Sequence, residues 1–323
     1  MNATKPARKL LFTVIALLLP FLVLLVVEIT LRAFGNKEDL SLFVDFGNER
    51  FLRVNHLIDK RYFNRLQTRV ASSGDLLLKQ KPENGYRIFV MGGSTAAGFP
   101  YPKNLMFSTV LQERLQQQLP YKYIEIVNVA ITATNSYTYV DIIDEMLRHQ
   151  PDAILIYGGH NEFYGALGVC STESLGQSRA MVNLALKLNR LHMVKGLRDL
   201  FAKARQKQVS TKELNQDESL MTKVIANNKV GYKGKLYTKA LKQFEGNMDL
   251  VLKKAKSKKV SVILSELVSN VKDMPPFEGA ENKALEDYKK QAPFYRNIML
   301  QKQKNFSIWP KTKTLFLFVR PKK

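Results

Sequence analysis

Cysteine and histidine are scarce in this chain of 323 residues, and their scarcity narrows the possible chemistry. A single cysteine, Cys170, cannot form an internal disulfide, so the fold must depend on its hydrophobic core. The four histidines are scattered, and none has the spacing of a metal-ligand motif. We therefore expect neither a metal nor a cofactor. The histidines are His56, His149, His160 and His192.

Acidic residues are also few, with 28 Asp and Glu against 50 Lys and Arg, which gives a formal net charge of +22. Such a charge first suggests a nucleic-acid partner. The excess is greatest in residues 187–259, where 19 basic residues face 6 acidic ones along helix-like stretches with few aromatics. No helix-turn-helix, zinc-finger or RNP-like pattern accompanies them. We expect no nucleic-acid binding, and a solvated basic face near anionic lipid headgroups instead.

One long apolar run is present, at residues 10–27 (LLFTVIALLLPFLVLLVV). Extended to residue 34, it reaches the length needed to span a bilayer. Basic residues precede it and a mixed set follows, so the positive-inside rule places residues 1–9 in the cytoplasm and the chain after residue 34 outside. A cleaved signal peptide is the alternative, but its apolar core is shorter and the flanking LRAFG is a poor cleavage site. We expect an uncleaved, single-pass anchor.

Short apolar segments alternate with amphipathic ones after residue 85. This alternation predicts a parallel sheet covered by helices on both faces. Right-handed crossovers bring the carboxyl ends of all its strands to one edge, where ligands bind in open α/β sheets. The expected strands are 86–91, 123–129, 153–157 and 260–267, and the expected helices are 107–119 and 137–150.

The expected domains follow from these patterns. Residues 35–84 are a linker or packing segment, and 85–275 form the α/β domain. Within that domain, residues 170–258 are too long for one crossover, so we expect a helical insertion with helices near 178–208 and 236–257. Residues 276–323 form a helix and an atypical basic tail without clean helical or strand periodicity.

Three polar, glycine-rich segments follow strands. In FVMGGSTAAG, Ser94 comes after a strand and two glycines, where it can expose its hydroxyl and point backbone N–H groups at an oxyanion. A helix cap or a turn is the alternative role of Ser94. A phosphate loop would need a Lys-Ser/Thr ending that is absent here.

The other two segments are NVAITATNSYT and YGGHNEFYG. The first offers the small residues Ala130 and Ala133, with Asn135 or Ser136 as a helix cap. The second offers Asn161, whose neutral side-chain amide suits an oxyanion donor, although asparagine is also common in turns.

The ordered set of GGST, N-x-x-x-x-A-x-x-S and G-x-N-E resembles the first three blocks of the SGNH/GDSL hydrolase superfamily. The resemblance covers about residues 85–275 and implies a three-layer, flavodoxin-like α/β fold and an ester substrate. It implies that Ser94 is the nucleophile. It also implies an oxyanion hole made by the N–H of Ser94, the N–H of Ala133 (or of Ala130) and the side chain of Asn161. GGST replaces the more familiar GDS, and alanine stands where the second block usually has glycine.

The family's fourth block, Asp-x-x-His, is missing, so the catalytic base is not found in the chain. No histidine has an aspartate three residues before it, and none follows the last expected strand. His160 is a weak substitute, because side chains of neighbouring residues on an extended loop point apart. With the odd basic tail, this suggests a truncated or frame-shifted C-terminus, or a natural form that is inactive or works with a partner.

Taken together, the sequence predicts a membrane-anchored serine esterase that works through an acyl-enzyme. Its location suggests lipid, polysaccharide or cell-wall esters as substrates. The alternatives are a non-catalytic, membrane-tethered protein that binds glycan or lipid, or an acyltransferase of the same fold.

Overall fold

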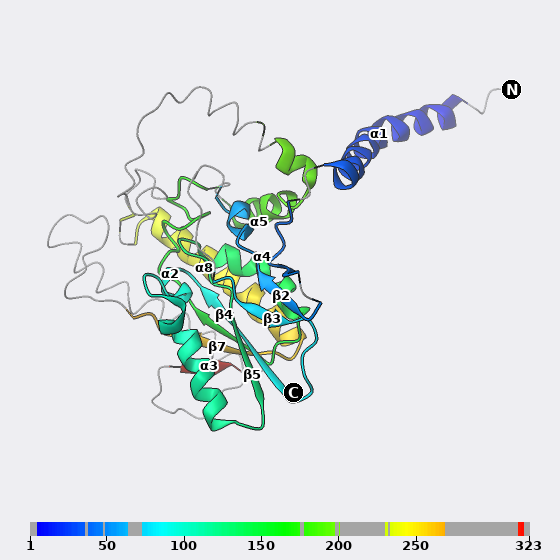
Figure 1. The fold of residues 1–323 in the computed structure, drawn as a ribbon. Helices are drawn as coiled ribbons and strands as arrows, with labels where there is room; N and C mark the ends of the chain where they lie inside the picture. The colour runs from blue at the N-terminus through cyan, green and yellow to red at the C-terminus, as the bar shows by residue number, and fades with distance from the viewer. Residues whose placement is uncertain are drawn as a thin grey trace, which may run out of the picture. The chain divides into compact units, whose positions relative to one another are not determined.

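The computed structural model describes residues 5–35, 38–47, 49–63, 73–174, 178–197, 200, 230–231, 233–268 and 316–319. The chain divides into two units (Figure 1). One unit holds Met1–Asp39 with Leu186–Glu213, and the other holds Leu40–Ala185 with Leu214–Lys323.

The larger unit is built on a five-stranded sheet in the order β5-β4-β6-β7-β8 (Figure 1). The first four strands run parallel, and β8 pairs antiparallel with β7. The predicted α/β fold with a parallel sheet is therefore confirmed. The strands are β4 (Gly85–Gly92), β5 (Tyr123–Asn128), β6 (Ala153–Tyr157), β7 (Ser261–Ser265) and β8 (Phe316–Val319).

Strand β8 lies in the basic tail, where no strand was predicted. Its four residues, FLFV, are all apolar and too few to show the alternation of apolar and polar residues that identifies a strand. The helix predicted after residue 276 lies outside the described residues.

Alternate side chains of each strand face opposite helical layers. Ile88, Val90 and Leu155 lie in one buried cluster with α2 (Ser94–Ala97), and α3 (Phe107–Gln118) packs its apolar side against the same cluster. Helix α4 (Ser136–Leu147) contacts α8 (Lys235–Ser257), α4 also contacts β4, and α8 also contacts β7. A 3-10 turn, η2 (Lys103–Leu105), connects α2 to α3.

The second helix expected in the insertion, 236–257, is present as α8 with bounds that differ by one residue. Helix α8 precedes β7 directly and buries one face, including Phe244, Met248 and Val251, so it serves as a crossover helix of the sheet. The helix predicted over 178–208 is broken, because α5 (Arg179–Leu188) ends before a second helical stretch at 192–197. The rest of the predicted insertion lies outside the described residues.

Residues 40–63 and 73–84 form a small antiparallel sheet that is bonded to α4. It consists of β1 (Phe43–Asp45), β2 (Phe51–Val54) and β3 (Leu76–Leu78), and a 3-10 turn, η1 (Ile58–Arg61), follows β2. The buried Arg61 guanidinium contacts Asp141 at 2.9 Å and Glu145 at 2.7 Å. The hydroxyl of Tyr62 also donates to Asp141, at 2.7 Å. These buried charged contacts fix the segment to α4.

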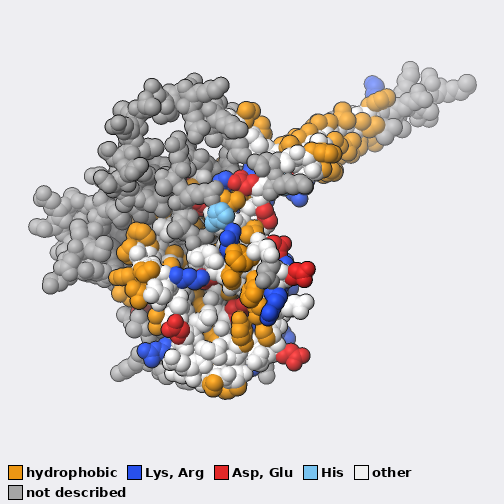
Figure 2. All heavy atoms as spheres, viewed as in Figure 1, with side chains coloured by type: hydrophobic (Ala, Val, Ile, Leu, Met, Phe, Trp, Pro, Cys, Tyr) orange, Lys and Arg blue, Asp and Glu red, His pale blue; other side chains and the backbone are white. Residues whose placement is uncertain are grey.

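The smaller unit contains α1 (Lys5–Phe34), whose stretch Phe12–Phe34 is long and apolar enough to cross a membrane. Its best window has a mean hydropathy of 2.8, and hydrophobic side chains cover the helix in Figure 2. By length and composition, α1 fits either a membrane span or a signal sequence.

Candidate active site

Ser94 begins α2, directly after β4 and the N-cap residue Gly93. The turn is tight, because a Cβ at Gly92 would lie 2.1 Å from the Tyr157 carbonyl oxygen. The strand can therefore approach β6 closely only with glycine here. Ser94 itself is half-buried, so the structure places it at the predicted carboxyl edge of the sheet with part of its surface accessible.

The side-chain amide of Asn161 lies against the residue before Ser94. A Cβ at Gly93 would fall 2.7 Å from Asn161 Nδ2, so only glycine leaves room for this amide. The same Nδ2 donates to the Thr134 carbonyl at 3.0 Å. Because a side-chain amide carries two N–H donors, one remains for a ligand. The loops after β4, β5 and β6 thus converge at Asn161, which is 9% exposed.

Ala133 adopts a left-handed conformation, with φ of 58°. This explains why glycine would be usual at such a position, since a Cβ is disfavoured there. Its carbonyl accepts from the N–H of Ala166 at 2.8 Å, which joins the loops after β5 and β6. The N–H of the alternative donor, Ala130, is already bonded to Asn128 Oδ1 at 3.1 Å. Of the two alanines, Ala133 is therefore the better candidate for an oxyanion donor.

The variant Ala133→Gly should be more stable than the wild type. Removing the Cβ relieves the left-handed strain, and the gain of about 1 kcal/mol exceeds the extra backbone entropy of glycine. Thermal unfolding of the full chain in detergent measures this difference. Ala130→Gly is the matched control, because Ala130 has no positive φ and should lose stability. Destabilisation of both variants to the same extent would contradict the strain argument.

Asn128 is a positioning residue that sequence reasoning did not single out, although it begins the second motif. Its Nδ2 donates to the Ala96 carbonyl at 2.7 Å and to Ser108 Oγ at 3.2 Å, while its Oδ1 accepts from Ala130. The side chain is fully buried. It therefore ties the end of β5 to the short helix that carries Ser94. Helix α4 is capped by Asn135, whose side chain accepts from Tyr137 N at 3.2 Å.

Glu162, the neighbour of Asn161, belongs to a buried chain of hydrogen bonds. Its two oxygens accept from the N–H and the hydroxyl of Ser136 at 2.8 and 2.7 Å. Ser136 Oγ in turn accepts from Asn247 Nδ2 at 3.0 Å, and Asn247 Oδ1 accepts from Arg179 Nε at 2.9 Å. Burial raises the pKa of Glu162 to about 7, although the bonds from Ser136 oppose this shift. The network fixes the loop of Asn161 to α4, α5 and α8.

Glu162 should make the protein less stable as the pH rises. The folded state holds its proton more tightly than the unfolded chain, so stability is lost between pH 4.5 and about 7. The full loss is roughly 3 kcal/mol. Unfolding of the wild type and of Glu162→Gln, measured from pH 5 to pH 8, should diverge, with the variant gaining relative stability at high pH. Glu113→Gln, on the exposed side of α3, should follow the wild type. Parallel curves for Glu162→Gln would contradict the account.

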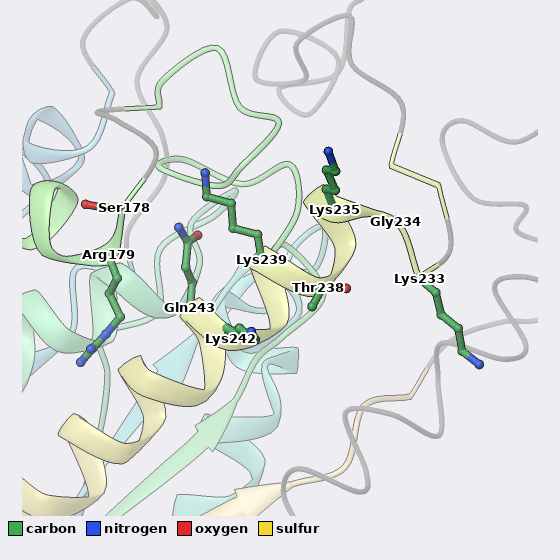
Figure 3. A pocket seen from close by; sticks show the side chains of 9 residues that line it. All are labelled: Ser178, Arg179, Lys233, Gly234, Lys235, Thr238, Lys239, Lys242 and Gln243. Atoms are coloured by element: carbon green, nitrogen blue, oxygen red, sulfur yellow. The ribbon is translucent and has the colours of Figure 1, made fainter.

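A depression of about 560 Å³ lies at the N-terminal end of α8 (Figure 3), and none of the three predicted site residues lines it. Arg179 reaches toward α8, where it also donates to the Gly246 carbonyl at 2.9 Å. Most residues that line the depression are basic. They are Arg179, Lys233, Lys235, Lys239 and Lys242, together with Ser178, Gly234, Thr238 and Gln243. The buried network therefore runs from the wall of this depression to the loop of Asn161.

None of the four histidines is hydrogen-bonded to Ser94 within the described residues. His160 Nε2 lies 3.3 Å from the Val268 carbonyl, and its ring packs edge-on against Tyr157. His149 packs edge-on against Phe43, and burial, then the charge of Arg87, lowers its pKa. The part of the chain that the structure describes also contains no group of three His, Cys, Asp or Glu side chains suited to a metal. The loops after β4, β5 and β6 thus carry the three predicted site residues, and within the described residues no histidine is bonded to Ser94.

Comparison with known proteins assigns the family. Residues 88–308 match the model of the GDSL-like Lipase/Acylhydrolase family, whereas a search among curated proteins finds no match. Among solved structures, the psychrotrophic esterase EstA from Pseudoalteromonas sp. is 14% identical in sequence and aligns with a TM-score of 0.31. The alignment covers 66% of this chain and 74% of the EstA chain. The acetyl xylan esterase AlAXEase shares 13%, with coverage of 66% and 71% and a TM-score of 0.32. TesA shares 16%, with coverage of 66% and 99% and a TM-score of 0.28. On the family match, which covers more than half of its length, the chain belongs to the GDSL-like lipase/acylhydrolase family.

Proposed function

We propose that this chain is a membrane-anchored ester hydrolase in which Ser94 forms an acyl-enzyme. The observation that supports the proposal is the closeness of the Asn161 amide to Gly93, the residue before Ser94. The hydroxyl of Ser94 attacks the ester carbonyl. The developing negative charge on oxygen is held by the N–H groups of Ser94 and Ala133 and by Asn161 Nδ2, and the alcohol leaves. Water then releases the acid.

The catalytic base is the part of this mechanism that the chain's histidines do not supply. A serine without a base reacts slowly, but the oxyanion hole and binding alone retain a 1,000- to 10,000-fold advantage over water in a well-studied serine protease. We therefore expect slow acylation of Ser94, accelerated by added imidazole, which can take the serine proton in place of the missing side chain.

A fluorophosphonate probe tests the proposal on the full chain in detergent. It should label the wild type and should not label Ser94→Ala. The control variant Thr95→Ala, which removes the hydroxyl of the exposed residue after Ser94, should be labelled like the wild type. Imidazole should increase the rate of labelling, and His160→Gln should leave it unchanged. A folded chain that is not labelled at Ser94, with or without imidazole, would contradict the hydrolase.

A non-catalytic binding protein is the second candidate, favoured by the other partners of the histidines nearest the sheet: His160 contacts the Val268 carbonyl and His149 packs on Phe43. Such a protein would hold an ester-bearing lipid or glycan in the same place without cleaving it. Absence of labelling together with binding of lipid or glycan would support it.

The surface next to Ser94 supports an ester with an apolar acyl chain. Phe99, whose N–H donates to the Ser94 carbonyl at 3.0 Å, is 68% exposed, and Tyr101 and Leu105 are also exposed. Three large apolar side chains in one short loop are an unusual use of surface. We infer that they hold the acyl chain of a lipid-type ester.

The variant Phe99→Ser/Tyr101→Ser should lose its preference for long acyl chains. Each methylene held by an apolar surface contributes up to about 0.8 kcal/mol, so kcat/KM for a decanoyl ester should fall at least tenfold. Activity on an acetyl ester should change little. Hydrolysis of nitrophenyl esters of increasing length, with imidazole present, gives the comparison. Equal losses on both esters would argue against acyl-chain binding, and a loss confined to acetylated sugars would indicate a glycan instead.

A further inference from the structure

A short helical stretch, residues 192–197, is bonded to the second half of α1. Glu28 of α1 accepts from the N–H of His192 at 3.0 Å and from the N–H of Met193 at 2.9 Å. The first N–H groups of a helix have no partner within it, so Glu28 serves as their cap. The Glu28 side chain is buried and also pairs with Arg32 at 2.8 Å.

A second contact holds the same stretch just beyond α1. The buried Lys195 ammonium lies 3.0 Å from the Glu38 carboxylate and 3.2 Å from the Glu38 carbonyl. Glu28 lies six residues before the end of α1, and Glu38 lies four residues after it. Both contacts lie within one unit of the chain, and Figure 1 shows the helical stretch beside the end of α1. The stretch is therefore fixed at the point where α1 ends.

The position of Glu28 sets the depth of this stretch in a membrane. The apolar run of residues 10–27 spans about 27 Å as a helix, close to the roughly 30 Å of a hydrocarbon core. Glu28 follows that run immediately and lies six residues, or about 9 Å, before the end of the apolar stretch Phe12–Phe34, so it lies close to the outer boundary of the hydrocarbon core. The stretch that it caps must then lie at the level of the headgroups.

The described residues from 187 to 200 expose leucines and basic side chains, as a helix in a membrane interface does. Leu188, Leu197 and Leu200 are 43, 51 and 63% exposed. Lys187 and Arg190, on either side of Leu188, are exposed as well. Residues 187–197 contain three Lys or Arg and no Asp or Glu. Exposed leucines beside exposed basic residues are typical of segments that lie in the surface of an anionic bilayer.

We propose that residues 187–197 and Leu200 lie in the membrane interface on the same side as the hydrolase domain. The leucines enter the boundary between headgroups and acyl chains, and the exposed Lys187 and Arg190 meet anionic lipid phosphates. The proposal rests on the membrane anchoring proposed above. It gives the chain a second attachment to the bilayer besides α1, held at a fixed depth by Glu28.

Fluorescence quenching in vesicles tests this placement. The full chain is inserted into phosphatidylcholine–phosphatidylglycerol vesicles whose acyl chains are brominated near the headgroup. An environment-sensitive fluorophore is attached at Leu197→Cys or Leu200→Cys; the native Cys170 is buried and should react little. We expect strong quenching at both positions. A label at Gln118→Cys, on the exposed end of α3, should be unquenched.

Two further variants separate this inference from the anchoring on which it rests. A label at Leu18→Cys reports on α1, and lipids brominated deep in the acyl chain should quench it. Quenching at Leu18 without quenching at Leu197 would overturn the interfacial segment and leave the anchor intact, whereas no quenching at either would overturn both. Glu28→Ala should reduce quenching at Leu197 and not at Leu18, while the surface control Glu113→Ala should change neither.

Discussion

Asn161→Ala should slow the reaction of Ser94 with a fluorophosphonate or an ester by about 100- to 1000-fold. Loss of one oxyanion donor removes about 2.7–4 kcal/mol of transition-state stabilisation in enzymes that use one. Here the amide is held in advance by the Thr134 carbonyl and by contact with Gly93, so little is spent on ordering it during the reaction. The effect should fall on kcat rather than on KM, because the donor acts on charge that develops in the transition state.

Two variants show whether that loss comes from the amide itself. Asn161→Asp keeps the shape but replaces the donor with a carboxylate that repels an oxyanion, so it should be at least as slow as Asn161→Ala. Asn84→Ala removes another asparagine, which lies just before β4, at the opposite end of the strand from Ser94, and donates to the Tyr121 carbonyl at 3.3 Å. This variant should react at the wild-type rate. Full reactivity of Asn161→Asp would rule out Asn161 as an oxyanion donor.

Arg87→Met should lower the free energy of unfolding by about 3–5 kcal/mol, the largest stability effect that we expect. Arg87 is 1% exposed and pairs with Glu125. Its other nitrogens donate to the carbonyls of His149 at 2.6 Å and Leu78 at 2.7 Å. Removing the guanidinium leaves a buried carboxylate and two carbonyls without this cation, and a buried charge without its partner is costly.

Chemical denaturation with a double-mutant cycle measures this effect. Arg87→Met/Glu125→Leu should recover much of the lost stability, because it removes both charges and leaves apolar groups of similar size. Arg114→Met, at an exposed position of α3, should change the unfolding free energy by less than about 0.5 kcal/mol. Equal destabilisation by the single and the double variant would mean that packing, rather than the charge pair, causes the loss.

The sheet was predictable because its strands are short, apolar and separated by helices with clear periodicity. β6 occupies the predicted residues 153–157, and the bounds of β4 and β5 differ by one residue from the prediction. Strand β8 was missed because a four-residue strand among basic residues carries no pattern that could identify it. The helix predicted over 236–257 corresponds to α8 within one residue, because its apolar face has helical spacing. Its packing against α4 and β7 depends on contacts that no local pattern shows.

The candidate site was predictable only in part, because its residues follow strands whereas its supports lie elsewhere. Ser94, Ala133 and Asn161 each come after a strand, and parallel topology brings such positions together. The strain at Ala133 and the pKa of Glu162 depend on dihedrals and burial that no local pattern encodes. One feature of the sequence indicated that Glu162 belongs to the site: it directly follows Asn161. Its partner Asn247 lies about 85 residues away in α8, beyond the range of any motif.

A crystal structure of the chain after reaction with a methyl fluorophosphonate tests the central claim most directly. The adduct places a phosphonyl oxygen where the oxyanion of an ester would develop. The convergence of the three loops predicts that this oxygen, bound through Ser94, lies within hydrogen-bonding distance of both Asn161 Nδ2 and Ala133 N. An adduct whose phosphonyl oxygen points into solvent, with the Asn161 amide out of reach, would contradict the proposed active site.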